Sequence, residues 1–294
     1  MLSFPAIIAV LGINVIFSGA YIFGKLGVEH FPPFLFAAFR FAIVAAVLAP
    51  FVRFDSAFRK HWRGVLGFCL TMGIGVYGTM YWALYLADGA SAVLIGTQFS
   101  TPVAVLLGAR FLGERASKEV WGGIALTLAG ALVVGFDQAA LGYPLAFALA
   151  LLAAVCYAAA NVISRGMRES KMGLLNLNAL MAIISAAPMF FLSWLFGEPW
   201  RAPVSGAGTL EWTTVLYSAV VVSVVGHVGM FRLLRYYPLS AVMPLYVFTP
   251  IFGVAGAVLF LGESPTLRFA AGATLALLGI AVINHFHRRE AKPA

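Results

Sequence analysis

Ten apolar segments, separated by clusters of Pro, Gly and charged residues, constrain the fold of this chain more than any other feature. Each is close to the roughly 20 residues that an α-helix needs to cross about 30 Å of hydrocarbon. Because lipid offers the backbone no hydrogen-bond partners, each segment is predicted to be a transmembrane helix. The predicted bounds are 4–26, 32–52, 64–86, 90–112, 118–136, 142–164, 173–196, 212–234, 239–261 and 266–286.

The composition excludes a water-soluble domain. Of the 294 residues, 62% are hydrophobic and only 10% are charged, whereas an average soluble domain carries roughly 25% charged residues. The net charge of +8 suggests a nucleic-acid partner at first, but the basic residues fall between the apolar segments, so none is expected. Cys69 and Cys156 lie inside apolar segments and are expected to be buried free thiols. We therefore predict an all-α integral membrane protein embedded in a lipid bilayer.

The distribution of Lys and Arg predicts how the chain is oriented, because cytoplasmic loops carry an excess of these residues. If the N-terminus is cytoplasmic, the basic clusters at 53–63, 110–118, 165–171, 232–235 and 288–292 all lie in the cytoplasm. The other side then keeps only Lys25, Arg201 and Arg268. The first segment lacks a basic start and is interpreted as a span rather than a cleavable signal peptide. Both termini are predicted to be cytoplasmic.

The chain contains an internal repeat. Residues 91–135 align without a gap to residues 240–284, and the tetrapeptide FLGE occurs in both, at 111–114 and 260–263. Two glycines of the first copy, Gly123 and Gly130, align with Gly272 and Gly279. Five spans per half is an odd number, so the second half must enter the membrane inverted. We predict ten transmembrane helices in two inverted five-helix repeats, residues 1–138 and 139–294, an architecture that recurs in secondary transporters.

The acidic residues argue against an enzyme. Every Asp and Glu lies at or near a predicted loop, whereas a membrane enzyme or proton pump would be expected to bury a carboxylate. The sequence shows no metal-ligand pattern and no nucleophile motif, so no catalytic residue, metal or cofactor is expected. Glu114 and Glu263 precede predicted helices that begin near Ser117 and Thr266. A structural role at these junctions is expected, because acidic groups are favourable near the positive end of a helix and Ser117 and Ser264 are candidate caps; a role in transport is the alternative.

The chain resembles a known transporter superfamily. Its ten spans, its two halves and the Gly113-Glu114 and Gly262-Glu263 pairs at the junction of the fourth and fifth span of each half resemble the drug/metabolite transporter superfamily. Within it, nearly the whole chain resembles the EamA-type exporters, and it is most similar to bacterial exporters of aromatic amino acids. The resemblance implies a bacterial inner-membrane protein whose spans 1–4 and 6–9 line a central cavity, with spans 5 and 10 as supports. The sequence is compatible with a monomer.

Aromatic and uncharged polar side chains inside the spans are the candidate substrate-binding residues. In span 1 they recur at i, i+3, i+4 and i+7, which places them on one helical face. Prolines beside the candidates in spans 4 and 9 break the helical ladder and can free a backbone carbonyl toward a cavity. The candidates are Asn14, Phe17, Ser18, Tyr21, Tyr77, Tyr81, Trp82, Gln98, Thr101, Tyr157, Asn161, Tyr246 and Thr249.

Two ionisable residues complete the candidate site. Arg40 lies within span 2, where an unpaired charge costs at least about 2.5 kcal/mol. It either binds a substrate carboxylate or ties helices together through backbone carbonyls. His227 lies within span 8 and is either a neutral hydrogen-bonded side chain or a group that couples transport to protons. The polar candidates have a structural alternative too, because Ser, Thr and Asn often join transmembrane helices. Lys25 is expected at the membrane interface.

These observations predict an inner-membrane transporter that exports small amphipathic metabolites by alternating access through a central cavity. The resemblance implies amino acids, and the aromatic residues favour aromatic ones because rings stack on rings. The alternative within transport is a drug or nucleotide-sugar carrier, although a phosphate-bearing substrate would need more cations than Arg40. A channel or a multispan membrane enzyme is the alternative from a different class.

Overall fold

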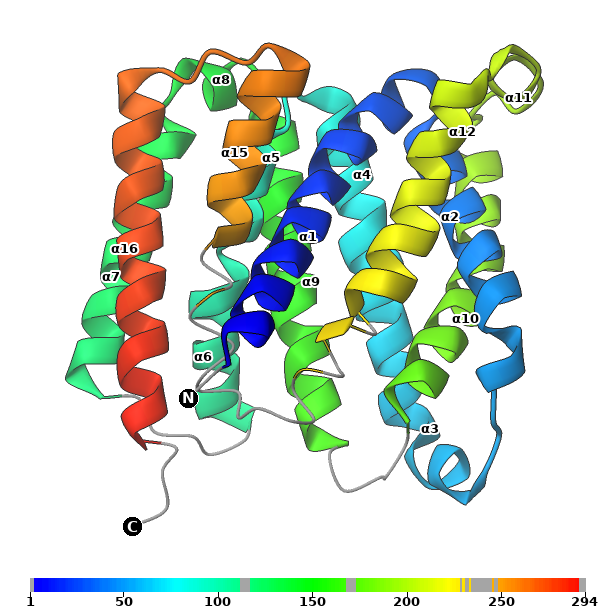
Figure 1. Ribbon diagram of the computed structural model, residues 1–294, viewed down its shortest axis with the longest axis horizontal. Coiled ribbons are helices and arrows are strands. Elements are labelled where there is room, and N and C mark those ends of the chain that lie inside the picture. Colours follow the sequence, from blue (N-terminus) through cyan, green and yellow to red (C-terminus); the bar gives the residue numbers. More distant parts are fainter. Residues whose placement is uncertain are drawn as a thin grey trace.

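A computed structural model describes residues 3–111, 117–167, 173–227, 229–230, 233, 245 and 248–290. These residues form helices joined by short connections, without a β-strand among them (Figure 1). The α-helices are α1 Phe4–His30, α2 Pro33–Leu48, α3 Ser56–Phe68, α4 Tyr77–Leu86, α5 Ser91–Thr97, α6 Ser100–Phe111, α7 Lys118–Gly135, α8 Gln138–Leu141, α9 Pro144–Gly166, α10 Leu174–Leu195, α11 Arg201–Gly206, α12 Thr209–Leu216, α15 Phe248–Leu261 and α16 Leu267–Glu290. Three other helical turns are η1 Ala49–Phe51, which is a 3₁₀-helix, and the π-helices η2 Cys69–Val76 and η4 Tyr217–Gly226.

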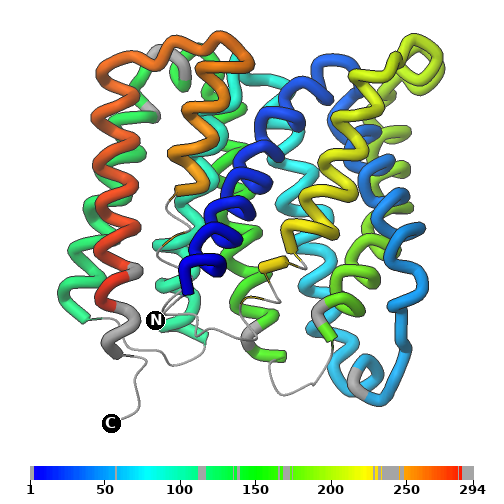
Figure 2. The backbone as a smooth tube through the Cα atoms, viewed as in Figure 1, coloured from blue at the N-terminus to red at the C-terminus, as the bar shows by residue number. Residues whose placement is uncertain are grey.

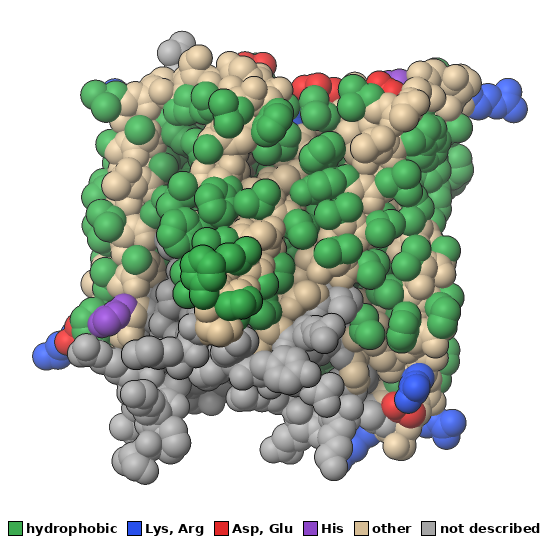
Figure 3. Space-filling view, viewed as in Figure 1, with side chains coloured by type: hydrophobic (Ala, Val, Ile, Leu, Met, Phe, Trp, Pro, Cys, Tyr) green, Lys and Arg blue, Asp and Glu red, His purple; other side chains and the backbone are tan. Residues whose placement is uncertain are grey.

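The helices confirm an all-α integral membrane fold. Within the described residues, seven are long and apolar enough to cross a membrane, and Phe248–Leu261 and Leu267–Ile283 are shorter apolar helices. Hydrophobic side chains cover the middle of the bundle in Figure 3, and charged ones gather at its two ends. The first helix runs to His30, beyond the predicted end at residue 26. Parts of predicted spans 8 and 9 lie outside the described residues, so the count of ten spans stays a prediction.

The start of α1 and the end of α16 lie at the same end of the bundle (Figure 2). We call this the lower end. The opposite, upper end contains the end of α1, the short helices α8 and α11, and the connection from α15 to α16 (Figure 1). An even number of spans requires both ends of the chain to lie on one side of the membrane.

The fourth predicted span is broken in its middle. α5 ends at Thr97 and α6 begins at Ser100. Pro102 has no N–H to offer the carbonyl of Gln98, four residues earlier. That carbonyl instead accepts a hydrogen bond from the backbone N–H of Thr101 (3.1 Å). The break therefore lies where the proline was predicted to disturb the helical ladder.

Spans 3 and 8 each contain a π-helix. The residue after η2 is Tyr77, and the residue after η4 is His227. These two positions agree with the register of the internal repeat to within one residue. π-Helices are rare and often occur at functional sites. The two halves thus share a local distortion as well as a sequence pattern, and both distortions precede a candidate site residue.

The aligned glycines form the contact between α7 and α16. A methyl group on Gly130 would lie 2.6 Å from the carbonyl oxygen of Gly272, and one on Gly123 would lie 2.9 Å from that of Gly279. Small residues allow such backbone contact between helices in lipid. Because Gly123 aligns with Gly272 and Gly130 with Gly279, exchanging the halves exchanges the two contacts. This antiparallel pairing is what an inverted repeat predicts. The two helices α7 and α16 lie together at one edge of the bundle (Figure 1).

Candidate functional site

A buried guanidinium lies at the contact between the two halves. Arg40 of α2 is 1% exposed. Its Nε donates to the carbonyl oxygen of Ser218 (3.1 Å), and its Nη2 donates to Oγ of Ser223 (2.8 Å). The centre of the guanidinium lies 3.7 Å from the centroid of the Tyr77 ring, which is a cation–π contact. Arg40 therefore does tie helices together, as one of the two predicted roles requires.

Ser218 and Ser223 were missed by the sequence analysis because both belong to the π-helix η4. In a regular α-helix, residues five apart point in directions about 140° apart, so the two serines would not share a face. The i→i+5 spacing of a π-helix brings them together, and Oγ of Ser223 donates to the carbonyl oxygen of Ser218 (3.2 Å). The signal in the sequence was only a pair of serines in a Val-rich segment.

Tyrosines from three helices gather beside the guanidinium. Tyr77 and Tyr81, one turn apart on α4, have ring centroids 5.9 Å apart. The hydroxyl of Tyr21 on α1 is hydrogen-bonded to Oγ1 of Thr97 (2.8 Å). Tyr157 on α9, from the second half, lies within electrostatic range of Tyr21 and Tyr77. The structure therefore brings these four predicted site residues together.

Tyr157 differs from its neighbours in exposure. It is 38% exposed, whereas Tyr81 is 1% exposed. Tyr157 nevertheless lies within electrostatic range of Tyr21 and Tyr77. Asn161, one turn later on α9, donates from its Nδ2 to the carbonyl oxygen of Tyr157 (3.0 Å). Tyr157 and Asn161 thus present a ring and an amide on one accessible face of α9.

His227 lies between α1 and η4. Its ring centroid is 5.1 Å from that of Phe17, and its Nδ1 is hydrogen-bonded to the carbonyl oxygen of Val222 (2.9 Å). The ring is also within electrostatic range of Arg40. Gly226 makes room for this contact, because a methyl group there would lie 2.8 Å from the Phe17 ring. Phe17, His227 and Arg40 therefore belong to the same region as the tyrosines.

Asn14 joins α1 to span 9. Its Nδ2 donates to the carbonyl oxygen of Leu245 (2.8 Å), and its Oδ1 accepts from Oγ1 of Thr249 (2.6 Å). Asn14 is fully buried, so protein partners occupy both ends of its amide in this conformation. Ser18 donates to the carbonyl oxygen of Val15 within its own helix. Tyr246, which was also predicted to belong to the site, lies outside the described residues.

The remaining candidates are placed differently. Gln98 and Thr101 lie at the break between α5 and α6, and both are partly exposed. Trp82 does not join Tyr81: its ring packs against Phe34 (5.2 Å) and Phe196 (5.0 Å) at the upper end. Successive helix residues point about 100° apart, so two adjacent residues cannot share one face.

Trp82 instead lines a separate cavity of about 430 Å³ at the upper end. Prolines and aromatic rings form most of its wall, and Glu198 closes one side. The carboxylate of Glu198 accepts from the backbone N–H groups of Phe34 (3.0 Å) and Leu35 (2.9 Å). Glu198, which follows α10, therefore caps the first turn of α2 in the other half.

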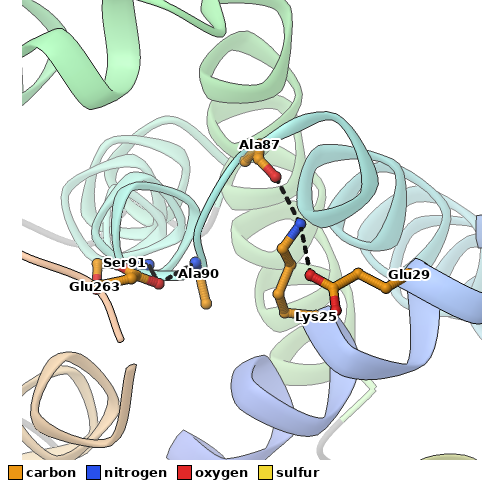
Figure 4. A network of polar contacts seen from close by, with 6 residues as sticks. All are labelled: Lys25, Glu29, Ala87, Ala90, Ser91 and Glu263. Carbon is orange, nitrogen blue, oxygen red and sulfur yellow. Dashed lines mark hydrogen bonds and ion pairs between the residues drawn. The ribbon is translucent and has the colours of Figure 1, made fainter. Parts of the chain in front are cut away.

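A second carboxylate from the second half also caps a helix of the first at this end (Figure 4). Glu263 accepts from the backbone N–H of Ala90 (2.5 Å) and of Ser91 (3.3 Å) at the start of α5. Glu263 thus has a structural role at this junction, but it caps α5 and not the helix that follows it, and Ser264 is not the cap of α16. Oγ1 of Thr266 accepts from the backbone N–H of Phe269 (3.0 Å) and caps α16 instead. Glu114 lies outside the described residues.

Two further predictions about helix ends have clear outcomes. Ser117 caps α7 as predicted, with its Oγ accepting from the backbone N–H of Val120 (3.4 Å). Lys25 was predicted at the interface but is buried. Its Nζ donates to the carbonyl oxygen of Ala87 (2.8 Å) and pairs with Glu29 (3.3 Å) (Figure 4). A cation at the end of α4 is favourable because carbonyls there lack helical partners.

A metal site is not found in the described part of the chain, where no three His, Cys, Asp or Glu side chains form a group that could hold an ion. The ionisable groups of the candidate site are Arg40, His227 and the tyrosines. Such a set can bind an anionic and an aromatic group.

The chain is similar to known transporters. A model of the EamA-like transporter family matches residues 4–136 and 144–285. The protein of Salmonella typhimurium named probable amino-acid metabolite efflux pump is 29% identical over 296 residues, which cover 98% of this chain and 95% of that protein. An Escherichia coli protein of the same name is 29% identical over 297 residues, covering 96% of this chain and 93% of that protein.

A solved structure, titled "Crystal structure of protein", has the same fold. It superposes with a TM-score of 0.66 at 23% sequence identity and covers 99% of this chain and 100% of that chain. The family is one of transporters, so the protein is a multi-pass membrane transporter rather than an enzyme. Since the family model covers most of the sequence, the chain belongs to the EamA-like transporter family.

Proposed function

We propose that the protein exports small amphipathic metabolites, in particular amino acids including aromatic ones, by alternating access through the region around Tyr21, Tyr77, Tyr81 and Tyr157. The observation that carries this proposal is a buried guanidinium that η4 of the second half holds against the ring of Tyr77 of the first half, with the ring of Tyr81 5.9 Å from that of Tyr77. In inverted-repeat transporters the substrate binds between the repeats near the middle of the membrane. The names of the two relatives, which refer to amino-acid metabolite efflux, support this substrate class.

The side chains suit the two parts of such a substrate. The tyrosine rings offer apolar faces on which an aromatic ring stacks. Asn161 on α9 and Gln98 at the break of span 4 have amides that can bond amino and carboxylate groups, and both are partly exposed. A nucleotide sugar is less suitable, because phosphates favour several cations and Arg40 is the cation in this cluster. The remaining predicted site residues are included in the proposal, as helix-joining or cavity-lining groups.

Transport by reconstituted protein tests the proposal. Purified protein in proteoliposomes should show saturable efflux of radiolabelled L-phenylalanine. Gln98→Ala should weaken apparent affinity roughly 5- to 150-fold, because a desolvated polar group of the substrate loses a partner worth about 1–3 kcal/mol. Tyr157→Ala should weaken it about 3- to 10-fold through loss of ring stacking. Both variants should keep a monodisperse gel-filtration peak.

Leu132→Ala is the matched control, since Leu132 lies on α7 with its side chain largely exposed. It should leave transport unchanged. Equal affinity in Gln98→Ala, Tyr157→Ala and Leu132→Ala would place the substrate elsewhere. Currents that do not saturate with substrate concentration would indicate a channel.

The proposed orientation has both termini in the cytoplasm. The start of α1 and the end of α16 lie at the same end of the bundle, and the positive-inside rule predicts that this end is cytoplasmic. A fluorescent reporter that matures only in the cytoplasm should be bright when fused after Ala294. Alkaline phosphatase, which is active only outside the cytoplasm, should be silent at the same position. With both termini in the cytoplasm, the upper end of the bundle faces the outer side of the membrane. The reverse reporter pattern would place the upper end in the cytoplasm.

A further inference from the structure

We propose that Nη1 of Arg40 and the hydroxyl of Ser218 donate hydrogen bonds to a carboxylate group of the substrate, so that a carboxylate, and not an amine, is the group that the transporter requires. This inference rests on the proposed function, because it assigns a chemical class of substrate to the same site. It begins from two buried polar atoms that have no hydrogen-bond partner, Nη1 of Arg40 and Oγ of Ser218.

The donors of Arg40 are only partly used. Two of its nitrogens donate to η4: Nε to the carbonyl oxygen of Ser218, and Nη2 to Oγ of Ser223. Nη1 donates to no atom of the described chain. A guanidinium presents five N–H donors in a rigid fork that matches a carboxylate. With Nε and Nη2 holding the group in place, the Nη1 corner is left for an outside acceptor.

The charge of Arg40 is also unpaired. In the described part of the chain, the salt bridge between side chains is that of Lys25 with Glu29. Among these residues, Arg40 has no carboxylate partner. The rings of Tyr77 (3.7 Å) and Phe41 (5.1 Å) approach the guanidinium, but a ring face compensates a charge only in part. Charged groups inside a membrane protein usually pair or mark the path of a substrate. A carboxylate supplied by the substrate satisfies both conditions.

Ser218 adds a second donor, on the helix that holds the guanidinium. Its carbonyl oxygen accepts from Nε of Arg40, so the serine and the guanidinium are fixed relative to each other. Its hydroxyl is buried and makes no hydrogen bond of normal geometry, although the Tyr81 side chain lies near enough to interact with it; a buried hydroxyl normally finds a partner. Within this region Tyr21, Tyr157 and His227 are partly exposed. We place the apolar body of the substrate against these three side chains.

The experiment compares three ligands that share one phenyl ring. L-Phenylalanine carries a carboxylate and an amine, 3-phenylpropionate carries only the carboxylate, and phenethylamine carries only the amine. Binding to the full-length protein in detergent is measured by calorimetry, and transport of the same compounds is measured in proteoliposomes. Wild type should bind the two carboxylates and discriminate against phenethylamine.

Three variants separate the roles of the side chains. Arg40→Gln should weaken carboxylate binding about 10- to 100-fold and leave phenethylamine unchanged. Ser218→Ala should weaken it about 3- to 10-fold. Because the Ser218 hydroxyl makes no hydrogen bond of normal geometry, its removal should lower the melting temperature less than Arg40→Gln does, so this variant serves if Arg40→Gln does not fold. Arg201→Gln is the control for charge alone, since Arg201 is exposed on α11.

The outcomes distinguish this inference from the proposed function. Equal binding and transport of the acid and the amine, unaffected by Arg40→Gln and Ser218→Ala, would overturn the proposed carboxylate-binding site, while export of aromatic compounds would stand. Carboxylate binding that depends on Arg40 without any transport would support the carboxylate-binding site and overturn the proposed function. Absence of binding by all three compounds would overturn both.

Discussion

Gly130→Leu should abolish correct packing of α16 on α7. A methyl group at this position would already lie 2.6 Å from the carbonyl oxygen of Gly272 and 2.8 Å from Cα of Ala276. These are backbone atoms and cannot rotate aside. Overpacking costs about 1–3 kcal/mol even where side chains can adjust, so a leucine against backbone should cost more. We expect most of the protein to run as aggregate in fluorescence-detected gel filtration.

Gly122→Leu is the matched control on the same helix. Nothing lies within 4 Å of a methyl group added at Gly122. Leucine is also a better helix former than glycine by roughly 0.8 kcal/mol, so this variant should keep a monodisperse peak and an equal or higher melting temperature. If both variants behave alike, the contact between α7 and α16 does not stabilise the fold.

The glycines show how much of the fold could be read from the sequence. Gly123, Gly130, Gly272 and Gly279 were recognised only because they align between the halves, and the structure places them in mutual contact. The helices could be predicted because about 20 apolar residues in lipid have few alternatives to a helix. The break of span 4 could be predicted because Pro102 removes a specific hydrogen bond.

The candidate site could be predicted only where the helix is regular. Tyr77 and Tyr81, four residues apart, share a face as expected from the period of an α-helix. Ser218 and Ser223 could not be found, because no simple sequence rule indicates a π-helix. Trp82 was chosen by adjacency to Tyr81, which is the wrong criterion on a helix.

Contacts between the halves were beyond the sequence as well. Glu263 was assigned to the helix that follows it, since local capping is the usual role of such a residue. Its actual partners, Ala90 and Ser91, are far away in the chain. Gly89 allows this approach, because a methyl group there would lie 2.5 Å from the Glu263 carboxylate. The burial of Lys25 could not be predicted for the same reason, since the carbonyl oxygen of Ala87 is brought to it only by the fold.

Glu263→Ala should loosen the start of α5 and weaken the contact between the halves at the upper end. The carboxylate is the acceptor for the backbone N–H groups of Ala90 and Ser91. A hydrogen bond to a charged group contributes about 1.5–3 kcal/mol. Hydrogen exchange of a peptide that covers residues 88–94 should therefore become roughly 10- to 150-fold faster in the variant.

Glu211→Ala separates this effect from loss of an ordinary helix cap. The Glu211 carboxylate accepts from the backbone N–H of Gly208 (2.8 Å) at the start of its own helix, α12. This variant should speed exchange near residue 208 and leave residues 88–94 unchanged.

The proposed alternating access moves the two halves relative to each other, and the contact of Glu263 with Ala90 and Ser91 joins the halves. Glu263→Ala should therefore also change the rate of L-phenylalanine efflux, whereas Glu211→Ala should not. Faster exchange at residues 88–94 with an unchanged efflux rate would make Glu263 a purely structural cap. Unchanged exchange would show that Glu263 does not hold α5 at all.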